Sequence, residues 1–175
     1  MNDTSSRFYG DATWLAAMAT IVLAALAAPG DIVSRVPRLA ALADAASSHL
    51  PFVAAFARLS PWPQVTTFTF LLAIGLAFLA MPLFVYFHVR LLDPATLKDR
   101  ADFEWSCWPI AALACIPFIW PGPALDGVGR PAGWEGAICH SRLALGVFAS
   151  ALMLVQMYAL SAPFIWLKCA LHRGR

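Results

Sequence analysis

Charged residues are scarce in this 175-residue sequence: 13% are Asp, Glu, Lys or Arg, whereas 61% are hydrophobic and the mean hydropathy is +0.70. Soluble domains carry about a quarter charged residues, so this composition excludes a water-soluble globule. The same hydrophobicity excludes a disordered chain. With a net charge of +2 and no dense basic patch, the sequence also excludes a nucleic-acid-binding protein.

Paired cysteines and recognisable catalytic motifs are missing as well. The four cysteines form no Cys-x-x-Cys pair, which excludes the four-helix quinone-linked disulfide oxidases of similar length, because those enzymes need cysteine pairs in their outer loops. The sequence has no Gly-rich phosphate loop, no Gly-x-Ser-x-Gly elbow and no pair of histidines placed to ligate haem within a helix bundle. We therefore expect no cofactor, no resident metal and no enzyme activity.

Long uncharged runs are what the sequence does contain. Uncharged stretches of 19, 31, 21 and 25 residues separate the charged residues, and a hydrocarbon core about 30 Å thick needs roughly 20 helical residues. None of these stretches has the polar face of a soluble amphipathic helix. The prediction is an all-α membrane protein with a single polytopic domain, 1–175, and four transmembrane helices near 13–29, 65–88, 106–121 and 144–167.

The distribution of Lys and Arg between the two sides predicts how the chain is oriented in the membrane. With four crossings both termini lie on one side, which collects seven Lys and Arg residues against five on the other. The positive-inside rule therefore places both termini in the cytoplasm. Because Arg outnumbers Lys ten to two and Ala is abundant, the sequence is typical of a high-GC bacterium. This favours the bacterial inner membrane as the location.

The two outer loops differ in character. From Pro37, the spacing of Leu39, Leu42, Ala46 and Leu50 predicts an amphipathic helix over about 37–50, lying on the membrane surface or packed over the bundle. The second outer loop, 121–142, is rich in Gly and Pro and is expected to be turn-filled rather than helical.

Two groups of candidate site residues follow from this topology. On the fourth helix, Gly146 and Ser150 form a small-xxx-small pair, and Gln156 is a polar residue deep in the span; all three are candidates for helix–helix contact. In the second outer loop, the adjacent Cys139 and His140 lie near two carboxylates and form a candidate outer-loop site. The carboxylates are Asp126 and Glu135.

Absent catalytic groups and a dense apolar surface favour a non-enzymatic accessory or scaffold subunit of a larger membrane assembly, of secretion, conjugation or respiratory type. Its expected partners are the lipid bilayer and other integral membrane proteins, with the oligomeric state open. In length, four crossings, inside termini and basic tail, the chain resembles the immunity proteins against pore-forming colicins, which implies protection against a membrane-inserted toxin as an alternative. A small oligomeric channel lined by Thr66, Thr69 or Gln156 is a further alternative, and an enzyme that uses outer-loop groups is a fourth.

Overall fold

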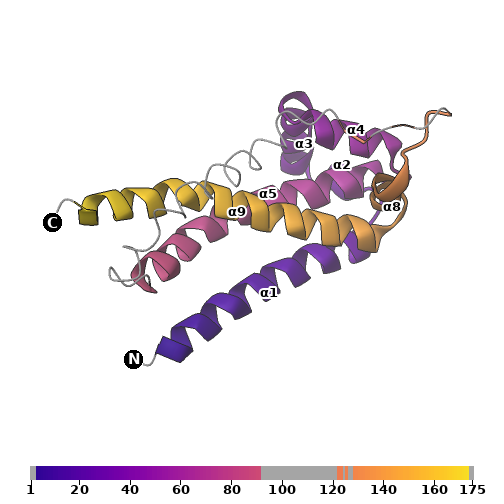
Figure 1. Ribbon diagram of the computed structural model, residues 1–175. Coiled ribbons are helices and arrows are strands. Elements are labelled where there is room, and N and C mark those ends of the chain that lie inside the picture. Colours follow the sequence, from indigo (N-terminus) through magenta and orange to yellow (C-terminus); the bar gives the residue numbers. More distant parts are fainter. Residues whose placement is uncertain (1–2, 92–121, 124, 126–127, 174–175) are drawn as a thin grey trace.

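The computed structural model describes residues 3–91, 122–123, 125 and 128–173. Within these residues the regular secondary structure is helical, apart from an isolated bridge between Leu125 and Pro131. The described helices, labelled as in Figure 1, are α1 (Asp3–Ala27), α2 (Ile32–Arg35), α3 (Pro37–His49), α4 (Pro51–Leu59), α5 (Pro63–Leu91), α8 (Gly133–His140) and α9 (Arg142–Arg173).

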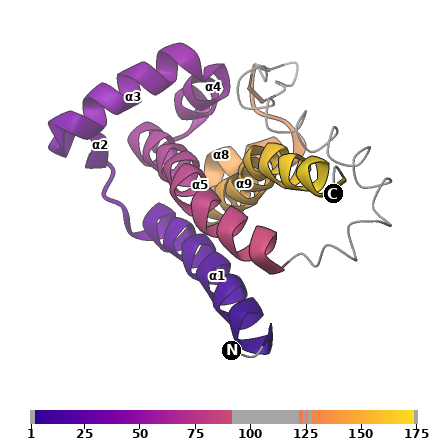
Figure 2. The same cartoon turned by 90° about the vertical axis from the view of Figure 1, so that its left-hand side faces the viewer.

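The three long helices α1, α5 and α9 pack side by side, and each contacts the other two. Helices α5 and α9 run in the same direction and α1 runs in the opposite one, as Figure 1 shows. Both chain termini therefore lie at one end of the bundle, which we call the terminal end. The short helices α2, α3, α4 and α8 gather at the other end, the loop end (Figure 2).

Two of these helices are long and apolar enough to cross a membrane: Pro63–Leu83 within α5 and Arg142–Ser161 within α9. They correspond to the predicted crossings at 65–88 and 144–167. Each has about 20 residues without a charged interruption, the length that a bilayer core requires. The all-helical prediction is thus confirmed for the described part of the chain, which contains helices able to span a membrane by length and composition.

The other two predicted crossings, at 13–29 and 106–121, are not among these two candidate spans. In α1 the part whose side chains are described, Thr13–Ala27, is apolar, and at 1.5 Å per residue it covers about 22 Å of a core about 30 Å thick. The predicted crossing at 106–121 lies outside the described residues. A further candidate span exists only if the bent pair α3 and α4 counts as one broken or re-entrant span.

The helix predicted over 37–50 is present as α3, Pro37–His49, with Pro37 in its first turn. Of the predicted apolar strip, Ala46 and Leu50 are buried and Leu39 is partly buried, whereas Leu42 is 56% exposed and Ala43 is buried instead. Small alanine side chains allow α3 to approach α5, which leaves the larger Leu42 at the margin of the contact. In Figure 2, α3 runs across the direction of the long helices.

A sharp bend separates α3 from α4. The chain direction changes by 109° between the two helices, at Leu50, which adopts φ −121° and ψ 84° ahead of Pro51. This conformation follows from the proline, because its ring disfavours helical geometry in the preceding residue. The bend turns the apolar side of α4 inward, so that Phe52, Val53 and Phe56 become buried.

The core at the loop end is built from aromatic side chains of α4, α5 and α9. The ring of Phe70 lies 5.0 Å from that of Phe52, 5.7 Å from that of Phe56 and 6.2 Å from that of Phe148, measured between centroids. Such edge-on and tilted contacts suit the aromatic quadrupole. Trp134 of α8 adds a further contact with Phe148, at 5.7 Å. This aromatic cluster fixes α4 and α8 onto the long helices.

The expectation that residues 121–142 hold only turns is wrong, because Gly133–His140 forms α8. The helix begins at Gly133, whose φ of +57° favours glycine, and Gly136 lies so close to Pro131 that a Cβ there would be 2.7 Å from the Pro131 carbonyl oxygen. Glu135 in the first turn and His140 in the last suit the helix dipole. The glycines therefore permit this helix rather than prevent it.

Candidate functional site

Gly146 lies where α9 crosses α1. A Cβ atom at this position would stand 2.9 Å from the Cα of Val22 and 3.2 Å from the Cβ of Ala25. These distances leave no room for a side chain, because the nearest atom is the backbone Cα of Val22, which cannot move without moving the helix. The glycine thus allows α1 and α9 of the same chain to pack closely.

Ser150 extends the same contact by one helical turn. Its side chain is 1% exposed, and its hydroxyl oxygen lies 2.8 Å from the Gly146 carbonyl oxygen and 3.2 Å from the Met18 carbonyl oxygen of α1. The hydroxyl thus donates within α9 and toward the neighbouring helix. Gly146 and Ser150, two of the three predicted helix-contact residues, both face α1.

Gln156 differs from the other polar residues of the spans. It is 6% exposed, and its side-chain oxygen Oε1 has no hydrogen-bond partner among the described residues. By contrast, Thr69 donates to the Val65 carbonyl oxygen at 2.7 Å and Ser161 to that of Tyr158 at 2.7 Å. Thr66, Thr69 and Gln156, proposed above as possible pore-lining residues, are all buried within the single chain.

The outer-loop candidates do not converge where the structure describes them. Glu135 and Cys139 lie one turn apart on α8 and are buried, with 8% and 1% exposure, whereas His140 is exposed. Adjacent residues of a helix point in directions about 100° apart, which separates the Cys139 and His140 side chains. Asp126 lies outside the described residues. Among those described, no three His, Cys, Asp or Glu side chains are grouped to hold a metal ion.

The Cys139 thiol lies in a buried environment. Burial, and secondarily the charge of Glu135, raises the pKa of the Cys139 thiol above its ordinary value. The thiol therefore stays protonated at neutral pH, and the protonated form is a poor nucleophile and metal ligand. Above the ordinary thiol pKa, the unfolded chain releases a proton that the folded state still holds. The free energy of unfolding should therefore fall as the pH rises above that value.

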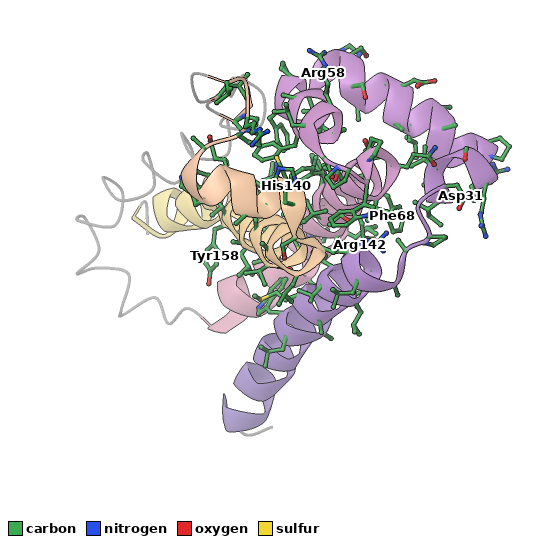
Figure 3. The ribbon with its side chains drawn as sticks, turned by 90° about the vertical axis from the view of Figure 1, so that its right-hand side faces the viewer. Asp31, Arg58, Phe68, His140, Arg142 and Tyr158 are labelled. Carbon is green, nitrogen blue, oxygen red and sulfur yellow. The ribbon has the colours of Figure 1, made fainter. Side chains whose placement is uncertain are left out.

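Arg142, one of the five basic residues predicted on the outer side, joins α9 to α1. Its Nη1 donates to the carbonyl oxygens of Leu26 and Ala28, at 3.1 and 2.9 Å, and so satisfies the last carbonyls of α1. Its guanidinium carbon also lies 5.1 Å from the centroid of the Trp62 ring. Figure 3 shows Arg142 at the start of α9, beside the end of α1.

Gln64 binds the segment that follows α1, at the start of α2. Its side-chain oxygen accepts hydrogen bonds from the backbone N–H groups of Val33 and Ser34, both at 3.1 Å, and so fixes the start of α2. We call Trp62, Gln64 and Arg142, together with the connection 28–34, the junction. Two features of the sequence could have pointed to the junction: an Arg at the first position of an apolar helix and a Trp beside a proline-rich break. Neither feature indicates which residues the side chain contacts.

The chemistry of the described residues is thus divided between packing contacts and a polar junction. The close contact of α1 with α9 holds two long helices together, and the junction joins three helices at the loop end. The buried thiol on α8 is separated from the exposed imidazole beside it. Comparison of the chain with models of known protein families, with curated proteins and with solved structures gave no match.

Proposed function

We propose that this chain is a four-helix protein of the bacterial inner membrane that serves as a non-enzymatic accessory or scaffold subunit and acts by helix–helix contact within a larger membrane assembly. The observation that carries the proposal is the outward face of α1 over Thr13–Ala27, which combines small and apolar side chains. The proposal has three parts: the number of crossings, their orientation and the contact face.

The positions of two described residues support a fourth crossing. Helix α5 ends at Leu91, at the terminal end, after 29 residues or about 43 Å. The chain is next described at Gly122, which is buried against Ala55 of α4 at the loop end. We propose that the uncharged stretch between Glu104 and Asp126, which includes the predicted crossing at 106–121, supplies the fourth span.

Orientation is tested by labelling cysteines from outside the cell. Helix α9 continues past its candidate span to Arg173 and carries Lys168, so the positive-inside rule places Cys169 in the cytoplasm. In a variant whose other three cysteines are serine, we expect Cys169 to react with a membrane-impermeant maleimide only after the cells are permeabilised. The matched probe is Asp44→Cys, on the exposed side of α3, which should react in intact cells. Labelling of Cys169 in intact cells with protection at position 44 would reverse the orientation.

The outward face of α1 suits contact with another helix. Ala16, Ala19, Thr20 and Ala27 are exposed along it, and the Thr20 hydroxyl donates to the Ala16 carbonyl oxygen at 2.8 Å, so it is already satisfied. Small side chains let two helix backbones approach closely within a bilayer. The same helix also exposes Leu15, Leu23 and Leu26, so apolar side chains border the small ones. Helix α1 also lies at the edge of the bundle in Figure 2.

The contact proposal is tested by adding bulk to that face. The double variant A16L/T20L should insert normally but lose its place in the high-mass species seen when membranes in mild detergent are analysed on native gels. Gly75→Leu is the control, since it adds similar bulk on α5 at an exposed position where a Cβ meets nothing within 4 Å. If the double variant keeps its high-mass species, or the control loses it equally, the α1 face is not the contact.

A further inference from the structure

The junction lies at the level where the two candidate spans begin. Arg142 is the first residue of the span in α9, and Trp62 immediately precedes Pro63, the first residue of the span in α5. In a bilayer this level corresponds to the headgroup region, where Trp and Arg side chains are common. The junction therefore meets the membrane where phosphate groups are most concentrated.

Hydrogen-bond donors remain unused at the junction. Both hydrogen bonds of Arg142 are made by Nη1, and none of the described residues accepts from its Nε or Nη2. Trp62 has an indole N–H, and Gln64 has a side-chain NH₂ group beyond the oxygen bonded to α2; neither donor has an acceptor in the described part of the chain. All three side chains are partly buried. A guanidinium, an indole and an amide donor therefore lie at the junction, beside residues 28–34.

The charge of Arg142 is not paired with a carboxylate of the described residues. Asp31, the acid in the same connection, pairs instead with Arg35, with Nε and Oδ2 2.8 Å apart. The guanidinium faces the carbonyl end of α1, whose partial negative charge compensates only about half of a unit charge. Its planar fork is suited to bidentate bonds with a phosphate.

We propose that the junction binds the phosphodiester group of a phospholipid in the leaflet at the loop end, with Arg142 as the main donor and Trp62 and Gln64 as supporting donors. A phosphodiester offers several acceptor oxygens and one negative charge, which match the unused donors and the unpaired guanidinium. The acyl chains of the same lipid would lie along the apolar faces of the spans. The inference rests on the membrane arrangement proposed above, which the labelling of Asp44→Cys and Cys169 tests separately.

Native mass spectrometry of the detergent-solubilised chain tests this site. Wild type should retain phosphatidylglycerol, and Arg142→Ala should bind it about tenfold more weakly, because hydrogen bonds to charged groups are lost. Arg58→Ala is the matched control: Arg58 is an exposed arginine of α4 that lies apart from the junction (Figure 3), and its loss should leave binding unchanged. Equal phosphatidylglycerol binding by the two variants would overturn the proposal.

Two further arms identify the ligand. Diacylglycerol, which lacks the phosphate, should bind no better to wild type than to Arg142→Ala. Glycerophosphoglycerol, which keeps the phosphodiester but lacks the acyl chains, should not compete at millimolar concentration. Should Arg142→Ala fail to fold, Trp62→Phe gives the decision, because it keeps the ring beneath the guanidinium and removes one donor. Phosphatidylglycerol binding should then weaken severalfold relative to Arg58→Ala, and unchanged binding would contradict the site.

Discussion

Replacing Phe70 with alanine should lower the free energy of unfolding by about 3–5 kcal/mol, the range for truncation of a buried aromatic side chain. Phe70 is fully buried, and its ring contacts those of Phe52, Phe56 and Phe148. The loss combines removed contacts with a cavity that the neighbouring helices α4 and α9 cannot close without shifting. Unfolding in detergent, followed by near-ultraviolet circular dichroism as denaturant is added, measures the change.

Phe78→Ala on the same helix is the control for this prediction. Its ring is 54% exposed on the outward face of α5, so its removal opens no internal cavity and should cost much less. Similar destabilisation by the two substitutions would mean that the aromatic cluster does not hold the loop end together. We also expect Phe70→Ala to increase proteolysis between α3 and α4, because α4 would lose its anchor.

Gly146→Leu should separate α1 from α9 and lower the free energy of unfolding by about 1–3 kcal/mol or more, the usual cost of overpacking. The first atom of the new side chain would overlap the Cα of Val22, which moves only if the whole helix moves. The hydroxyl of Ser150 would lose its approach to the Met18 carbonyl oxygen at the same contact. The distance between spin labels placed on the exposed sides of α1 and α9 should increase.

The comparison for this second prediction is Gly75→Leu, which introduces the same side chain into a long apolar helix. At Gly75 a Cβ meets nothing within 4 Å, so the added leucine should leave both stability and the distance between the spin labels nearly unchanged. Replacing glycine with leucine also favours a helix intrinsically. Destabilisation confined to position 146 is the expected pattern, and an unchanged distance in Gly146→Leu would contradict the close contact.

The outcome at the loop end illustrates what a single sequence can predict. Pro37 and the apolar spacing that follows it predicted the helix now seen as α3, because helix starts and helical periodicity are local properties. The same spacing predicted the burial of Ala46 and Leu50, but Leu42 is exposed, because burial also depends on how closely α5 approaches. In α8, the Gly and Pro residues suggested turns, but the glycines at 133 and 136 accommodate a helix instead.

The sequence by itself determined that the described part of the chain is helical and apolar. Charge-free runs of about 20 residues predicted helices able to cross a membrane, since each backbone polar group in a bilayer must be satisfied within the segment, and α5 and α9 contain such helices. Only the tertiary structure decided what these helices contact: Ser150 meets Met18 across 132 residues of chain, and Arg142 meets Ala28 across 114. Pairings of this kind depend on the relative positions of whole helices, and residue type and local spacing carry no record of those positions.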